Sequence, residues 1–319
     1  MEYEEKQLKR FCSSGDIPGL LTYLAEFPDQ KALLDRYEAV FIKQPATFEY
    51  PTDNAVLNDI LDGYYQYYIY VFGQNQSPQK GEAFLLQVFQ EKFNYHWVRK
   101  IDTMERLIKR MVIQEGYHYL GGTTSAYYGP YIWKTTEKHL YAVEIPSGTV
   151  DVSVFFMKEF ISNSWLSFLA FGKTGTGGWT KRKGLFCKWD SYQEKLDQPS
   201  FQISFLKHEA QHLFDFQKYG RRLSQPLMEY RAKLCELSYY PNSDLFEQFL
   251  NTAKDDENYA HSQSEFWIVS DLSQALFEKE YVTDVEQWRN NYAKVAAISR
   301  QFLQDNKRLK LEKLKLFKR

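Results

Sequence analysis

The residues best suited to chemistry lie in one short segment, residues 204–215, which reads SFLKHEAQHLFD. His208 and His212 are four positions apart, so on a helix their side chains share one face, with Cβ atoms about 5 to 6 Å apart. That spacing suits two imidazoles that bind the same metal ion. Glu209 lies one position further round the helix, where its carboxylate reaches a metal-bound water without binding the metal itself. The segment therefore predicts a metal site with a general base beside it.

The pattern is rare in a chain of this composition. The chain has only 6 His, and chance placement of His-Glu-x-x-His is expected roughly 0.008 times per chain. The apolar period predicts a helix over residues 200–219, with Ile203, Leu206, Ala210 and Leu213 on the opposite side for packing. The alternative interpretation is a pair of structural histidines on a half-buried helix.

A third ligand is expected, because a catalytic zinc site usually has three protein ligands and a water. Glu229, seventeen residues after His212, is the candidate. Gly220 allows the chain to turn, and Pro226 lies at the start of a second predicted helix, over residues 225–240, that carries Glu229.

Two other acids lie near enough in sequence to take part in the site. Glu236, seven residues after Glu229 on the same helix face, is either the third ligand instead or the acceptor for a histidine N–H. Asp215, three residues after His212, is either a supporting residue of the site or an ordinary surface acid.

His208-Glu209-x-x-His212, followed by Glu229 on the next helix, resembles the zincin metallopeptidases, and within them the gluzincin branch typified by thermolysin and related aminopeptidases. The resemblance covers about 100 residues, from the strands near 149 to the helix that ends near 240. In that branch the two histidines and the downstream glutamate bind zinc, the glutamate of the motif activates water, and a preceding edge strand pairs with the substrate backbone. The resemblance thus implies a zinc-dependent peptidase.

The chain departs from that branch at two positions. The second histidine and the downstream glutamate are slightly closer than usual, and Lys233 stands where an acid often follows the ligand glutamate. Such enzymes place a donor for the oxyanion downstream of the zinc ligands. Tyr240, Tyr259 and His261 lie in that region, and we select His261 as the catalytic candidate.

The order of predicted elements is helices, then strands, then helices. Helices are expected up to about residue 116, and again from about residue 200 to the C-terminal end. Strands are expected at residues 139–146, 149–157, 165–171 and 184–189. We therefore predict an α+β fold, with a helical N-terminal region at 1–116 and a zincin-like domain at 117–319 that has a small, mainly antiparallel sheet. The glycine-rich stretch 172–178 lacks the pattern of a phosphate-binding loop and predicts a hairpin connection between two strands.

The composition points away from several classes of protein. The 40 Lys+Arg and 41 Asp+Glu residues give a net charge of -1, which argues against a nucleic-acid partner. Cys12, Cys187 and Cys235 are far apart and form no CxxC pair, as expected in a reducing compartment. The first residues do not have the pattern of a secretory signal, and no apolar run is long enough for stable membrane insertion, so neither is expected. We expect a cytoplasmic enzyme that acts on a peptide or protein substrate.

A non-enzymatic interaction protein is the alternative function. In that case the N-terminal helices or the basic C-terminal tail, residues 307–319, bind a protein partner, and the zinc site is structural or relict. This alternative predicts a closed site with four protein ligands and no open position for water.

Overall fold

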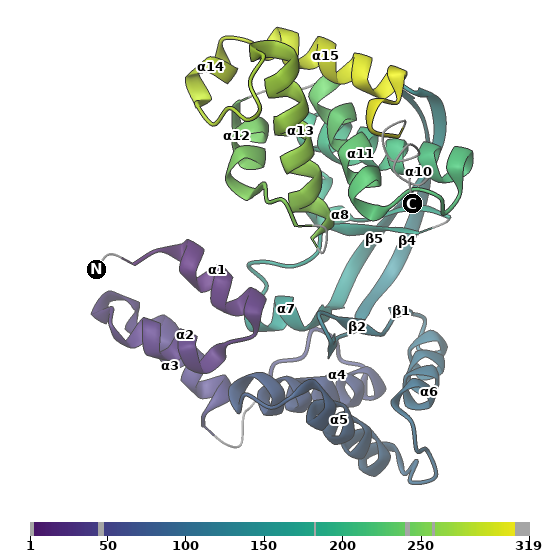
Figure 1. Ribbon diagram of the computed structural model, residues 1–319. Helices are drawn as coiled ribbons and strands as arrows, with labels where there is room; N and C mark the ends of the chain where they lie inside the picture. Colours follow the sequence, from purple (N-terminus) through teal and green to yellow (C-terminus); the bar gives the residue numbers. More distant parts are fainter. Residues whose placement is uncertain (1–2, 44–47, 182, 240–242, 257–258, 310–319) are drawn as a thin grey trace, which may run out of the picture. The chain divides into compact units, whose positions relative to one another are not determined.

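The structure is a computed structural model that describes residues 3–43, 48–181, 183–239, 243–256 and 259–309 (Figure 1). It confirms the α+β class, with helices on both sides of the strands along the chain. Tyr240 and residues 310–319, which include most of the basic tail, lie outside the described residues. Within the described part of the chain, no helix combines the length and the apolar character that crossing a membrane requires.

The chain forms two compact units, which we call unit 1 and unit 2. Unit 1 comprises Met1–Thr136 and Met157–Gly177, and unit 2 comprises Glu137–Phe156 and Gly178–Arg319. The helices before residue 116 all belong to unit 1, and the predicted metal ligands all belong to unit 2. The two long strands, β4 (Tyr131–Ile145) and β5 (Gly148–Asn163), each contribute residues to both units.

Unit 1 is mainly helical. Its helices are α1 (Glu5–Ser14), α2 (Ile17–Ala25), η1 (Pro28–Gln30), α3 (Lys31–Phe41), α4 (Ala55–Tyr68), the π-helical η2 (Ile69–Gly73), α5 (Pro78–Phe93), α6 (Ile101–Gln114) and α7 (Ser164–Leu169). Polar caps begin several of them: Asn54 accepts a hydrogen bond from the backbone N–H of Leu57 at the start of α4. The tyrosine-rich face of α4, with Tyr64, Tyr67 and Tyr68, is buried in the core of this unit.

The strands form a mixed five-stranded sheet in the order β1-β4-β5-β7-β6 and a separate two-stranded pair. The strands are β1 (His118–Leu120), β4 (Tyr131–Ile145), β5 (Gly148–Asn163), β6 (Gly178–Lys181) and β7 (Gly184–Lys188), with β2 (Thr123–Thr124) and β3 (Tyr127–Tyr128) as the pair. β6 pairs antiparallel with β7, with Thr180 opposite Leu185, and it is an edge strand of the sheet. At the first residue of β7, Gly184 has a φ of 138°, a conformation that side chains disfavour.

Two predictions for this part of the chain are wrong. Residues 165–171, expected as a strand, form most of α7, because Trp165 and Leu169 are four positions apart and are both buried on one helical face. The stretch 172–178 is therefore not a hairpin connection between two strands, since it follows α7 and leads into β6.

Unit 2 surrounds its central helix, α11, with other helices (Figure 1). Its helices are α8 (Trp189–Tyr192), α9 (Pro199–Phe201), the π-helical η3 (Gln202–Lys207), α10 (His208–Tyr219), α11 (Gln225–Tyr239), α12 (Ser243–Thr252), α13 (Ala260–Phe277), α14 (Val285–Arg289) and α15 (Tyr292–Asp305). α11 packs against α10, α13 and α15, which explains why nearly every residue in its second half is buried. Because α11 packs against α10, Glu229 on α11 has a fixed position relative to α10.

Candidate metal centre

The histidine motif begins α10, directly after the π-helical segment η3. The predicted helix at 200–219 is therefore present, but most of its first half, Gln202–Lys207, is the π-helical η3 between the short α-helix α9 and α10. π-Helical segments often occur beside functional sites. Gly220, with a φ of 62°, ends α10, and the chain reverses into α11, which carries Glu229. The helix pair thus places Glu229 opposite the two histidines, as expected from the sequence.

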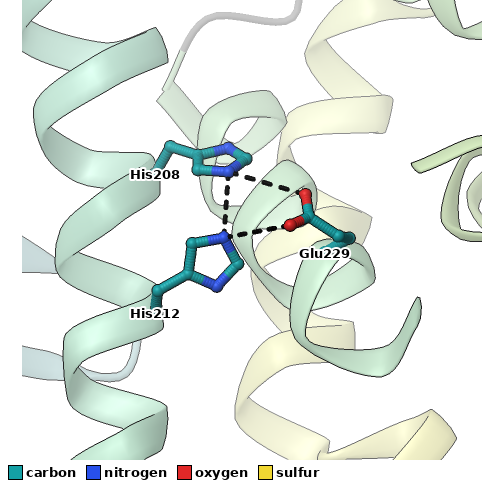
Figure 2. Close-up of side chains that lie close together, drawn as sticks. All are labelled: His208, His212 and Glu229. Atoms are coloured by element: carbon teal, nitrogen blue, oxygen red, sulfur yellow. Dashed lines mark hydrogen bonds and ion pairs between the residues drawn. The ribbon is translucent and has the colours of Figure 1, made fainter. Parts of the chain in front are cut away.

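The side chains of His208, His212 and Glu229 converge on one point (Figure 2). The two Nε2 atoms lie 3.1 Å apart. Glu229 Oε1 is 3.5 Å from His212 Nε2, and Glu229 Oε2 is 3.7 Å from His208 Nε2. Ligand atoms that lie about 2.0 to 2.1 Å from a tetrahedral zinc ion are separated by about 3.3 to 3.4 Å, so these three groups are spaced as zinc ligands are.

The carboxylate of Glu229 is partly buried, and its environment favours the charged form. Its side chain is 17% exposed. Among the described residues Oε2 forms no hydrogen bond of good geometry, although His261 Nδ1 lies 3.1 Å from it in an ion-pair contact. Burial raises the pKa of Glu229, but the imidazoles of His212 and His261 lower it by more, so the pKa lies well below its usual range. A buried, ionised carboxylate that is incompletely hydrogen bonded is unfavourable. A cation between Glu229 and the histidines removes this penalty, so the residues present fit a metal ion.

Glu236 orients His208 rather than joining the metal-facing group. Its Oε1 lies 2.5 Å from His208 Nδ1, on the opposite side of the ring from Nε2. Burial lowers the pKa of His208, but the hydrogen bond and the charge of Glu236, together with the nearby carboxylates of Glu209 and Glu229, outweigh burial and raise that pKa above its usual value. A carboxylate on the far nitrogen fixes the tautomer and the ring orientation of a metal-binding histidine. Of the two roles left open for Glu236, the geometry favours the acceptor role.

Lys233 occupies the position at which the gluzincin branch often has an acid, and its partner is Glu265 rather than a residue of the metal-facing group. Lys233 Nζ lies 2.5 Å from Glu265 Oε1, and both side chains are almost fully buried. Lys233 also donates to the backbone carbonyl of His261. Lys233 thus links α11 to α13, and Glu236, three positions further along α11, contacts His208.

Glu209 lies beside the convergent group and lines the same pocket of about 560 Å³. Its Oε2 accepts a hydrogen bond from the hydroxyl of Thr180 on the edge strand β6. The pocket is lined by Thr180, His208, Glu209, His212, Gln225, Met228, Glu229, Ala260 and His261. Because Thr180 and His261 are exposed, the pocket is accessible from solvent. The sequence did not single out Thr180, since a threonine on a short strand carries no distinguishing signal.

Of the candidate oxyanion donors, His261 lines the pocket and Tyr259 does not. His261 lies at the N-terminal end of α13, 71% exposed, with its Nδ1 atom 3.1 Å from Glu229 Oε2. It therefore lies at the pocket, next to the third ligand candidate. Tyr259 is exposed and does not line this pocket, and Tyr240 lies outside the described residues.

Asp215 belongs to a buried polar network, so its interpretation as a surface acid is wrong. Its side chain is 0% exposed and accepts hydrogen bonds from Arg231 Nε at 2.8 Å and from Gln211 Nε2 at 2.9 Å. Gln211 in turn accepts from the hydroxyl of Ser147 in the turn between β4 and β5. This network joins α10 to α11 and to the strands, and thus supports the helices that carry the site. Arg231 and Gln211 gave no signal in the sequence because their types are ordinary on a helix.

Comparisons with protein-family models, with curated proteins and with solved structures found no match to this chain.

Proposed function

We propose that the protein is a zinc-dependent metallopeptidase that hydrolyses peptide bonds. The observation that carries the proposal is the convergence of His208 Nε2, His212 Nε2 and the Glu229 carboxylate, with Glu209 beside them in a pocket accessible from solvent. Two imidazoles and one glutamate form a donor set typical of catalytic zinc. Among the described residues this group has three members, so these residues would hold a zinc ion with one of its four positions left for a water.

Each residue has a distinct role in the proposed reaction. A bound zinc ion would lower the pKa of a water and polarise the substrate carbonyl. Glu209 takes the proton of the attacking water and later gives it to the leaving amine, as general base and then general acid. Thr180 holds the Glu209 carboxylate toward the pocket through its hydroxyl. His261, on the rim, is placed to donate to the developing oxyanion.

A peptide fits the surroundings of this pocket. Among the described residues β6 has a single neighbouring strand, β7, and edge strands are where an extended peptide can add to a sheet. Thr180 of β6 contacts Glu209, which brings this edge next to the reacting group. We therefore take a peptide or an extended segment of a protein as the substrate. The free, buried cysteines agree with action in the cytoplasm, and this location is part of the proposal.

Hydrolysis of a quenched fluorescent peptide library tests the proposal. The unmutated protein should cleave members of the library, and Glu209→Gln should lose at least about 100-fold in rate, the range of general acid–base catalysis. Glu194→Gln, an exposed residue of the same unit that does not line the pocket, is the matched control and should keep full activity. Equal rates for Glu209→Gln and the control would exclude the proposed role of Glu209.

A further inference from the structure

A second cavity, of about 770 Å³, is formed entirely by residues of unit 1. Its walls come from α3, from the end of α4, from the last residues of β5 and from α7 and the loop after it. The cavity is lined by Arg36, Val40, Phe48, Glu49, Tyr65, Ile161, Ser162, Asn163, Ser164, Ser167, Phe168, Phe171 and Gly172. Small-molecule sites are typically about 300 to 1,000 Å³ in volume, so this cavity has the size of a ligand site.

Aromatic rings form the apolar part of the wall. Tyr65 and Phe168 are stacked with their ring centroids 4.7 Å apart, and Phe48 packs edge-on against Tyr65. None of these three side chains is fully buried, although each contacts the core. Rings that pack against one another and remain partly accessible offer a preformed surface for a planar or apolar group.

The cavity also has one positive and one negative side chain. The guanidinium of Arg36 lies over the ring of Phe171, 4.0 Å from its centroid. This stacking leaves the in-plane N–H groups of Arg36 available to a carboxylate. Glu49 lines the same cavity. Among the described residues, neither Arg36 nor Glu49 forms an ion pair, with the other or with a third residue.

Two buried polar atoms in the lining have no hydrogen-bond partner among the described residues: Asn163 Oδ1 and Ser164 Oγ. Ser164 is only 4% exposed. Buried polar groups are almost always paired, so an unpaired one in a cavity wall points to a missing partner. Ser164, the first residue of α7, and Phe171, two residues after its end, also have left-handed φ values of 64° and 47°. Such strain in residues other than glycine is concentrated at functional sites.

We propose that this cavity binds a free α-amino acid with an aromatic or large apolar side chain. The carboxylate of the ligand pairs with Arg36 and its ammonium pairs with Glu49, so that each charge of the zwitterion meets an unpaired opposite charge. The apolar side chain lies against Tyr65 and Phe168. The ammonium or a water that comes with it donates to Asn163 Oδ1. This site is separate from the metal centre and does not depend on the proposed peptidase activity.

Calorimetric titration of the full chain with L-phenylalanine tests the proposal. N-acetyl-L-phenylalanine keeps the carboxylate and lacks the ammonium, whereas L-phenylalaninamide keeps the ammonium and lacks the carboxylate. We expect L-phenylalanine to bind with a Kd below about 1 mM, and each of the two blocked analogues to bind at least about tenfold more weakly. Absence of L-phenylalanine binding up to about 10 mM, or equal binding of all three compounds, would overturn the proposal.

Variants locate the binding. Arg36→Gln and Glu49→Gln should each weaken L-phenylalanine binding at least about tenfold. Because Arg36 and Glu49 are exposed, the two variants should unfold thermally at the same temperature as the unmutated protein. Arg10→Gln, an exposed arginine of α1 that does not line the cavity, should bind normally. His208→Ala should also bind normally, which separates this cavity from the metal centre. Loss of binding in His208→Ala with no loss in Arg36→Gln would assign the amino acid to the metal centre instead and contradict the inference.

Discussion

Arg231 Nε donates a hydrogen bond of 2.8 Å to Asp215 Oδ2, and the two side chains are 4% and 0% exposed. Asp215 is on α10, one turn beyond His212, and Arg231 is on α11, two residues after Glu229. The ion pair therefore joins the two helices close to the point where the ligand candidates meet. A buried pair of this kind holds its elements in one register because neither charge can remain there alone.

Removal of one partner of this pair should destabilise the fold. Arg231→Met leaves Asp215 buried and unpaired, which is expected to reduce the free energy of unfolding by about 3 to 5 kcal/mol. Urea unfolding followed by circular dichroism measures the change. Arg289→Met, which removes an arginine from exposed ion pairs with Glu286 and Glu247, is the matched control and should cause a much smaller change. Equal effects of the two substitutions would show that the pair between Arg231 and Asp215 does not hold the helices together.

Glu236 should control the affinity for metal without binding the metal. Its Oε1 is hydrogen bonded to His208 Nδ1. Loss of the partner that orients a metal-binding histidine typically lowers metal affinity about 10- to 100-fold. We expect that loss for Glu236→Ala and a smaller one for Glu236→Gln, whose amide oxygen still accepts the N–H. Competition for zinc with a chromophoric chelator measures the affinities. Unchanged affinity in Glu236→Ala would contradict the assigned role.

His261 should affect turnover rather than metal content. It lies on the rim of the pocket, and its Nδ1 atom is 3.1 Å from Glu229 Oε2. If it donates to the oxyanion, His261→Ala should lower kcat about 100-fold with zinc content and KM nearly unchanged. Peptide hydrolysis and metal analysis of the same preparation separate the outcomes. Loss of zinc in this variant would mean that His261 supports Glu229 instead of the reacting carbonyl.

The sequence predicted the parts of the site that depend on helical spacing. His208 and His212 are on one helix face, and Glu229 faces them, because a four-residue spacing and a glycine-ended helix fix those positions locally. Other contacts depend on tertiary packing. Thr180 reaches Glu209 because β6 is placed at the edge of the sheet, and no local pattern encodes that position.

The errors in the predicted fold arise where a local sequence pattern is compatible with more than one secondary structure. Residues 165–171 are rich in aromatic and apolar residues, which favour strands, but residues 165–169 are helical and bury Trp165 and Leu169 on one face. The periodicity of residues 284–313 predicts a single helix. The described part of this segment, up to residue 309, contains α14 and α15 with a break at Asn290 and Asn291, where the side chain of Asn291 donates to the backbone carbonyl of Gln287 and competes with the helix. The π-helical winding of η3 has no sequence signature of its own.

Metal analysis of the protein purified without added zinc tests the central claim most directly. The account predicts close to one zinc ion per chain in the unmutated protein, since three convergent ligands define one catalytic site. His208→Ala should contain almost none, while Glu209→Ala should keep its zinc and fail to hydrolyse peptides, because Glu209 acts on water and does not bind the metal. Near-zero bound metal in the unmutated protein, or equal metal content in the unmutated protein and His208→Ala, would contradict the account.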